Sequence, residues 1–353
     1  TIKDKDKDTV ILMMSFDSGV VLAVDANLEV IKKMSTEDIS IARSNGDVLL
    51  NPNQDGPYIV NSFDYSETFK ILYVCFENGK SENSDSKNGL VVAFDISNGI
   101  TSSNPIAFSE APDFFSKFSS IVVNKIGNNL HVLGESSSNS VLRIHDLEPD
   151  NGEIILKASK TADKDTTNLE LFNNRVYFAS NESSKLYSLG TSIKSDFKET
   201  TIQGHITQLK ANDDFGFIHL LDDKNYRILS MNEAQDIYSS TYFKEKPKSM
   251  TDFGDSVYVL YEGTSITLPS LSNSINQNES VNLIEFDNPI GTELNIGDVV
   301  TLEHLGNTYY LVSLSNNSKD SKVIYIETFS PFEDINPTDT TVSLKGNIIS
   351  KVN

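Results

Sequence analysis

The chain has 353 residues, with 50 acidic and 29 basic side chains, a formal net charge of −21 and no tryptophan. A surface this acidic repels phosphate backbones, and its densest basic segment, residues 244–248, is short and interrupted by a glutamate, so direct nucleic-acid binding is not expected. No stretch approaches the roughly 18 consecutive apolar residues that span a bilayer. We therefore expect a protein without a membrane span.

A polar turn followed by a short apolar strand recurs along the chain. The seven strand segments that follow such turns are residues 9–15, 70–76, 130–134, 175–180, 215–221, 256–261 and 308–314. Their intervals of about 40 to 62 residues bracket the 40 to 50 expected of four-stranded propeller blades. The pattern predicts an all-β fold, a single β-propeller domain over residues 1–353. Seven blades of four antiparallel strands is the favoured count, and the wide spacing of the first units leaves six or eight as alternatives.

The segments between these strands continue the same pattern. Third strands are expected at residues 89–94, 140–144, 226–230 and 322–327, and fourth strands at 153–157 and 197–202. The segment 111–118 is the best candidate for helical periodicity, and we expect a loop or a single helical turn there. Two longer loop insertions are expected near 35–64, with an outer strand at 47–50, and near 269–280. Long loops on a rigid scaffold are where binding surfaces tend to lie.

The C-terminal segment predicts how the propeller closes. Residues 348–352 are left over after the last unit has used strands near 299–302, 308–314, 322–327 and 341–344, while the first unit lacks a strand before Thr9. Pairing of the C-terminal strand with the N-terminal blade would close the ring and remove an exposed sheet edge. Deletion of residues 348–353 would then destabilise the whole domain.

The third-strand segments carry a family resemblance. Ser140-Val-Leu-Arg-Ile-His-Asp146, followed by Asn151-Gly152, resembles the end of a WD-type repeat, with His145 where the signature tryptophan would stand. Residues 90–95 and 21–25 have the same form. These segments equally resemble quinoprotein-like repeats, whose third strand also ends in an aspartate before a glycine turn.

One unit carries two further elements of the WD-type pattern. Gly204-His205 precedes the unit at Asp213 at the spacing of the family's Gly-His pair, and Asp222-Asp223 occupies the turn where the family places a structural aspartate. The resemblance implies a propeller that binds other proteins through its blade faces.

The histidines and the cysteine are candidates for chemistry. His131 and His219 occupy equivalent places after their turns, where inner strands would line a channel, but neither has a partner at metal-ligand spacing. We expect structural roles for both. The other histidines are His145, His205 and His304. Cys75 lies within the apolar run 71–76, and we expect it to be buried and to pack as a small hydrophobic residue.

Two acidic segments are candidates for calcium. Residues 4–8 alternate aspartate and lysine, but Thr9 and Ser15 stand where a calcium loop needs glycine and glutamate. Residues 146–152 form a better oxygen cluster, which a Pro-Asp-Asn-Gly turn explains without an ion. No nucleophile elbow, phosphate loop or zinc-protease motif occurs. We therefore assign no catalytic, cofactor-binding or metal-binding residue and expect no cofactor.

The first hypothesis for function is a non-catalytic protein–protein interaction scaffold, a subunit of a multiprotein complex in the cytoplasm or nucleus. Its acidic charge favours protein partners with basic surfaces. The alternative is a propeller enzyme, or a ligand- or calcium-binding protein, that uses the central channel. A secreted or lumenal location is also open, because glycosylation sequons occur at Asn181, Asn278 and Asn316.

Overall fold

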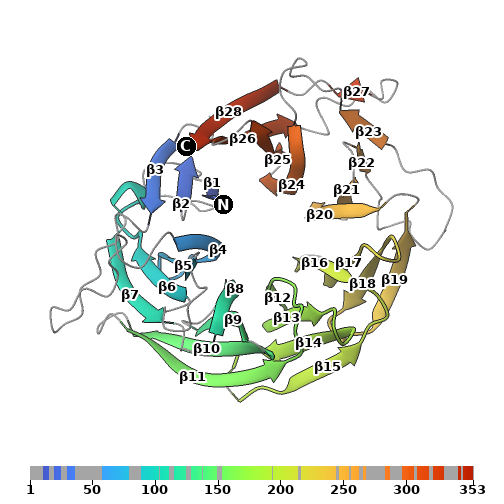
Figure 1. Ribbon diagram of the computed structural model, residues 1–353. Coiled ribbons are helices and arrows are strands. Elements are labelled where there is room, and N and C mark those ends of the chain that lie inside the picture. Colours follow the sequence, from blue (N-terminus) through green and yellow to red (C-terminus); the bar gives the residue numbers. More distant parts are fainter. Residues whose placement is uncertain are drawn as a thin grey trace. The chain divides into compact units, whose positions relative to one another are not determined.

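The computed structural model describes 21 segments of the chain: residues 11–15, 20–24, 30–35, 58–78, 89–102, 104–110, 115–124, 129–136, 138–148, 153–192, 194–213, 216–243, 246–253, 256–261, 265–267, 283–286, 296–305, 308–317, 321–329, 341–342 and 345–352. Within them every element is a strand except the 3-10 turn η2 (Ile100–Ser102) (Figure 1). No helix of this part could cross a membrane. The chain divides into two compact units, Thr1–Ile202 and Gln203–Asn353.

The first unit contains antiparallel meanders whose strands follow one another in sequence, and two of these meanders join through one parallel strand pair into an eight-stranded sheet. Its first sheet consists of β1 (Ile11–Ser15), β2 (Val20–Val24) and β3 (Val30–Ser35). A four-stranded meander follows, with β4 (Tyr58–Ser66), β5 (Ile71–Asn78), β6 (Gly89–Asp95) and β7 (Asn104–Glu110). The next meander has β8 (Phe115–Val123), β9 (Asn129–Ser136), β10 (Ser140–Glu148) and β11 (Glu153–Ala162). The last has β12 (Glu170–Phe172), β13 (Arg175–Ser180), β14 (Lys185–Gly190) and β15 (Phe197–Thr201).

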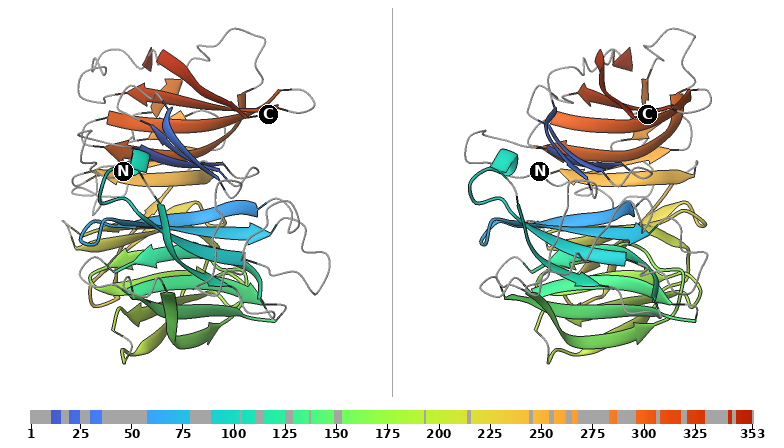
Figure 2. Two further views of the ribbon diagram at one scale, coloured as in Figure 1. Left: turned by 90° about the vertical axis from the view of Figure 1, so that its left-hand side faces the viewer. Right: turned by 60° about the vertical axis from the view of Figure 1, so that its left-hand side comes forward.

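The second unit repeats this arrangement. Its first sheet consists of β16 (Ile206–Asn212), β17 (Phe217–Asp222), β18 (Arg227–Asn232) and β19 (Ile237–Tyr242). The next contains β20 (Pro247–Phe253), β21 (Ser256–Tyr261), β22 (Ser265–Thr267), β23 (Leu283–Phe286) and, parallel to β23, β27 (Thr341–Val342). The last has β24 (Ile296–Leu305), β25 (Thr308–Asn317), β26 (Ser321–Phe329) and β28 (Lys345–Val352). Figure 2 shows the strands of each sheet from two further sides.

The predicted all-β fold of the β-propeller class is confirmed, since the described part of the chain is nearly all strands and contains several four-stranded antiparallel meanders. Each segment predicted to follow a polar turn lies largely or wholly within a strand, and from β5 onward it is the second strand of its meander. The predicted third strands are β6, β10, β18 and β26, and the predicted fourth strands are β11 and β15. The count of seven blades and the single domain stay predictions.

Strand β5 is continuously apolar over residues 71–76 because both of its faces are buried. In β5, Leu72, Val74 and Phe76 belong to one hydrophobic cluster, while the alternate residues Tyr73 and Cys75 belong to another. All five are fully buried. A strand covered on both faces needs no polar alternation, and this explains the continuous apolar run in the sequence.

Two of the polar turn pairs lie within the described residues, and both connect the two strands of a hairpin. Asn173 and Asn174 join β12 to β13, and both have positive φ, 45° and 56°. Two-residue hairpin loops favour this left-handed geometry because it matches the twist of the flanking strands, and asparagine tolerates it better than most residues. The turn pair therefore marks the entry to the second strand of its sheet.

The C-terminal strand does not pair as predicted. β28 pairs antiparallel with β26, from Lys322↔Val352 to Thr328↔Lys345, so it is the fourth strand of its own sheet. Residues 341–342, expected to provide that fourth strand, pair with β23 instead. A strand's sequence does not specify which of several free edges it joins, because the backbone hydrogen bonds are the same at each edge.

Two other expectations need correction or fall outside the described residues. Phe115–Val123 is strand β8, so the second half of the segment 111–118 is extended, not a loop or helical turn. β4 begins at Tyr58, so the end of the predicted insertion 35–64 is also a strand. The strand at 47–50 and the insertion at 269–280 lie outside the described residues.

Deletion of residues 348–353 is expected to open the last sheet. The truncation removes most of β28 and leaves the hydrogen-bonding groups of β26 without their partner strand. Hydrogen exchange should therefore accelerate first in β24–β26, and the thermal unfolding temperature should fall. An unchanged exchange pattern in β26 would contradict this assignment.

Candidate functional site

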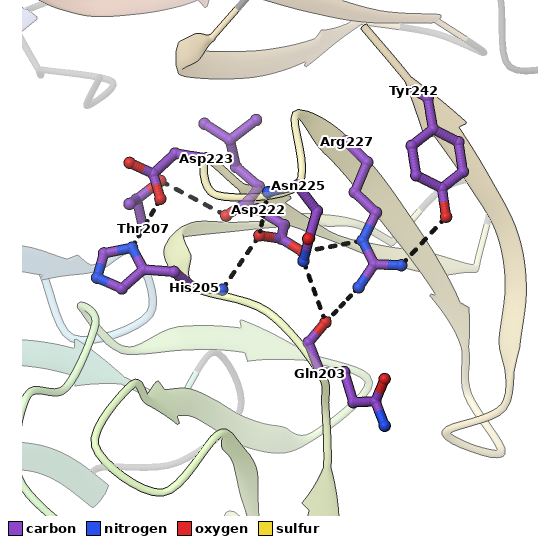
Figure 3. A network of polar contacts seen from close by, with 9 residues as sticks. Gln203, His205, Thr207, Asp222, Asp223, Asn225, Arg227 and Tyr242 are labelled. Carbon is purple, nitrogen blue, oxygen red and sulfur yellow. Dashed lines mark hydrogen bonds and ion pairs between the residues drawn. The ribbon is translucent and has the colours of Figure 1, made fainter.

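A polar network joins the start of β16 to the turn between β17 and β18 (Figure 3). The carboxylate of Asp222 is fully buried and accepts hydrogen bonds from the His205 amide at 3.1 Å and from Arg227 Nε at 2.8 Å. Asn225 donates to it from its amide nitrogen at 3.1 Å and from Nδ2 at 2.8 Å. The structure thus brings together the Gly204-His205 pair and the turn aspartate that the sequence singled out.

Gly204 leaves the space that this carboxylate occupies. A Cβ atom at position 204 would lie 2.2 Å from Asp222 Oδ2, which is too close for any side chain. Burial raises the pKa of Asp222, but the bonds from Asn225, the His205 amide and Arg227 outweigh burial and leave the pKa below its usual value. Asp222 is therefore a buried carboxylate held as an anion, and its bonds tie the β17–β18 turn to the start of β16.

A second carboxylate lies beside the first and is more accessible. The side chain of Asp223 accepts from His205 Nδ1 at 2.7 Å and pairs with Lys246 Nζ at 3.2 Å. His205 and Lys246 are nearly half exposed, so water screens these pairs and each contributes little to stability.

Arg227 extends the network to the outer strand β19. Its Nη1 donates to the hydroxyl of Tyr242 at 3.3 Å, its Nη2 donates to the carbonyl of Gln203, and its guanidinium carbon lies 5.9 Å from the centroid of the Tyr242 ring. Figure 3 shows the Tyr242 hydroxyl directed toward the guanidinium. Because Asp222 holds Arg227 in place, Tyr242 is oriented at the surface without being buried.

The outer strand β19 carries three large, exposed apolar or aromatic side chains, which we call the β19 patch: Ile237, Tyr238 and Tyr242. They are 55%, 60% and 65% exposed, and they make up half of the six exposed large hydrophobic residues among the described ones. The ring of Tyr238 lies 5.1 Å from that of Phe217 on β17. A contact of this kind, like that of Arg227 with Tyr242, restricts the rotamers of an exposed aromatic side chain.

Three of the five histidines are buried in strands. His131 in β9, His145 in β10 and His219 in β17 are at most 1% exposed. His219 Nδ1 lies 2.9 Å from Ser230 Oγ, whereas both ring nitrogens of His131 and of His145 lack a hydrogen-bond partner among the described residues. Burial lowers the pKa of each to about 4, and for His145 the charge of Arg143 and the proximity of His131 add to the effect.

The structural roles of His131 and His219 stay a prediction. His131 and His219 lie in different sheets, and the described residues contain no group of three histidine, cysteine, aspartate or glutamate side chains that could hold a metal ion. His304 is part of β24. Cys75 is fully buried, and burial raises the pKa of its thiol, which makes it unreactive.

The acidic segments and the glycosylation sequons predicted from the sequence lie only partly within the described residues. Asp146 accepts a hydrogen bond from Asn129 Nδ2 and lies 3.8 Å from Lys157 Nζ, and Glu148↔Glu153 closes the hairpin at the predicted turn. Residues 4–8 and 149–152 lie outside the described residues, as does Asn278. Asn181 lies in the turn between β13 and β14, and Asn316 lies within β25.

Sequence reasoning did not identify the β19 patch. The segment Ile-Tyr-Ser-Ser-Thr-Tyr contains only residues that are neutral and mostly strand-forming, and it follows a polar turn that contains Glu233 and Asp236. The fourth strand of a repeat faces solvent and is therefore expected to carry charged residues. The absence of charge from this fourth strand is the sequence feature that could have indicated the patch.

No family model matches the chain, and no curated protein matches it in sequence. Solved structures match it in three dimensions. A functionally unknown protein from Desulfotomaculum acetoxidans is 9% identical with a TM-score of 0.64, over 97% of this chain and 95% of its own. Sqt1 from Saccharomyces cerevisiae is 10% identical with a TM-score of 0.57, over 93% and 83%. The dihydro-heme d1 dehydrogenase NirN is 10% identical with a TM-score of 0.60, over 97% and 64%. The likeness is one of fold.

Proposed function

We propose that this protein is a non-catalytic scaffold that binds other proteins, with the β19 patch as one of its contact surfaces. The observation that carries the proposal is the gathering of Ile237, Tyr238 and Tyr242 on one outer strand, where they are more than half exposed. Exposed aromatic side chains that gather on one element mark interaction sites more often than scattered ones do.

The way in which the patch is held supports this role. Tyrosine and arginine are enriched among the residues that contribute most to protein interfaces, and both occur here. Tyr242 is fixed by Arg227 and Tyr238 contacts Phe217, so the rings lose little further conformational freedom when a partner binds. The net charge of −21 favours partners with basic surfaces and would speed their association.

We also infer that the sheet β16–β19 is a WD-like repeat. Support comes from the Gly204-His205 pair, whose glycine gives room to Asp222 and whose histidine amide donates to that aspartate. In this assignment the network is structural, and its functional consequence is the positioning of Arg227 and Tyr242.

Photocrosslinking from the patch tests the proposal. With p-benzoylphenylalanine in place of Tyr238, irradiation of the native cells is expected to link the protein to one or a few defined partners, identified by mass spectrometry. The matched control carries the same residue in place of Phe69, which is also exposed, at 41%, but lies between β4 and β5. The absence of crosslinked proteins from position 238, or an identical set from position 69, would contradict the proposal.

A further inference from the structure

Two sheets of the described part of the chain show an outer strand that pairs with a further strand at its outer edge. In the sheet that begins with β20, the outer strand β23 pairs in parallel with β27 through Glu285↔Thr341 and Phe286↔Val342. In the first unit, the outer strands β7 and β11 pair through Phe108↔Glu153. An unpaired edge offers a row of free N–H and C=O groups, and proteins either cover such an edge or protect it with charge.

Other outer strands carry charged residues. β15 has Lys198 and Glu199, both exposed, and β28 has Lys345 and Lys351. β19 has neither form of protection, because its sequence contains no charged residue and no described strand pairs with its far edge. It is an open, uncharged edge that also carries the exposed aromatic residues of the β19 patch.

The register defines which backbone groups of β19 are available. The amide of Phe243 donates to the carbonyl of Tyr226 at 2.7 Å, and Thr241 pairs with Ile228. Hydrogen-bonded residues alternate along an antiparallel pair, so the N–H and C=O groups of Ser240 and Tyr242 are directed away from β18. These groups can form a ladder with one more strand.

The charges at the two ends of β19 differ. Glu233 and Asp236, in the turn before β19, are exposed, and their carboxylates have no ion pair within the described part of the chain. At the other end Arg227 is paired with Asp222 and Lys246 with Asp223, and Lys224 is exposed in the β17–β18 turn. The edge is therefore negative at its start, and a binding segment should be positive there.

We propose that β19 binds an extended segment of a partner protein as a fifth strand, with Lys or Arg at the end that lies beside Glu233 and Asp236. Main-chain hydrogen bonds to Ser240 and Tyr242 provide the affinity, and contacts with the β19 patch and the two carboxylates provide the selectivity. This inference rests on the proposed scaffold function, and it specifies the partner's conformation and charge.

Selection from a displayed library of random dodecapeptides on the purified 353-residue chain tests the inference. The enriched peptides are expected to carry Lys or Arg toward one end and to alternate apolar and polar residues. Their affinity, measured by fluorescence anisotropy, should fall about tenfold or more in Ser240→Pro, which removes an outward N–H and narrows the backbone conformations at the edge. Ser240→Ala is the matched control and should bind like the unchanged protein.

Three further measurements keep the test decisive. Proline is tolerated on edge strands where the N–H faces solvent, so Ser240→Pro should keep the far-ultraviolet circular dichroism of the unchanged protein. If it does not fold, N-methylation of alternate peptide backbone nitrogens gives the same test on the ligand, and binding should be lost. Glu233→Gln with Asp236→Asn should weaken binding and reduce its dependence on salt.

The outcomes separate this inference from the proposed function. No enriched peptide, or peptides that bind Ser240→Pro and their N-methylated forms unchanged, would overturn strand addition, and the scaffold role would stand if crosslinks from position 238 persist. If the purified protein binds peptides but forms no crosslinks from position 238 in the cell, the scaffold role would be overturned. A dimer that Ser240→Pro dissociates would identify a second copy of this chain as the occupant and overturn the assignment to a partner.

Discussion

Acidification from pH 6.5 to pH 4 is expected to reduce the free energy of unfolding by several kcal/mol, because three buried histidines are uncharged in the folded protein. His131, His145 and His219 are almost completely buried, and burial lowers the pKa of each from 6.5 to about 4. Only His219 has a hydrogen-bond partner for its ring, Ser230. Protonation in the folded state would place a charge where nothing described can pair with it.

The direction of the effect follows from the two pKa values. Between pH 6.5 and 4 the unfolded chain binds protons at these histidines and the folded chain does not, so acid favours unfolding. Their contribution is fully present above pH 6.5 and is lost as the pH falls toward 4. At about 1.4 kcal/mol per pKa unit, each histidine accounts for about 3 kcal/mol, against a total stability of about 5–15 kcal/mol for a typical domain.

Denaturant unfolding at pH 7, 6, 5 and 4 measures this loss. His131→Gln removes one titrating group, so the loss of unfolding free energy between pH 6.5 and pH 4 should be smaller by about a third. His145→Gln should have the same effect. His205→Gln provides the comparison at an exposed histidine, since that side chain is 44% exposed and pairs with Asp223. A stability that stays constant from pH 6.5 to 4 would show that these rings are not buried as neutral groups.

Asp222→Ala is expected to destabilise the second unit by about 3–5 kcal/mol, the usual cost of removing one partner of a buried ion pair. The substitution leaves the guanidinium of Arg227 without its carboxylate and removes the acceptor of the His205 and Asn225 amides. Arg227 then no longer holds Tyr242, so crosslinking from the β19 patch should also weaken.

Two neighbouring substitutions provide the controls. Asp223→Ala removes only screened contacts with His205 and Lys246 and should cost no more than about 1 kcal/mol. Gly204→Ala keeps every charged group but places a Cβ on the Asp222 carboxylate, so it should destabilise in the same direction as Asp222→Ala. Equal unfolding midpoints for Asp222→Ala and Asp223→Ala would contradict the buried network.

The sequence predicted the inner strands better than the outer ones, for a physical reason. The segment 175–180 coincides with β13 because that strand is buried on both faces and begins after an asparagine turn, and both features leave a local signal. β19 is exposed and pairs with one described neighbour, and the left-handed residue of its preceding turn is Gln235, which is neither glycine nor asparagine, so the sequence of Ile237–Tyr242 and its turn marks the strand less strongly. The pairing of β28 depends on which edge is free in three dimensions, which no local pattern encodes.

The residues of the candidate site were likewise predictable only in part. Gly204-His205 and Asp222 could be found because their spacing along the chain is fixed by one hairpin. Arg227 and Tyr242 could not be found from the sequence, since their contact crosses from β18 to β19 and depends on the register Arg227↔Tyr242.

The local pairing of strands also has a consequence for synthesis of the protein. The sheets β12–β15 and β16–β19 are each made from one uninterrupted stretch of the chain, with every hydrogen-bonded neighbour adjacent in sequence. Contacts at such short separations form quickly, because little chain entropy is lost in closing each hairpin. Each of these sheets can therefore assemble while later residues are still being translated, and the β19 edge would be complete before the C-terminal third of the chain leaves the ribosome.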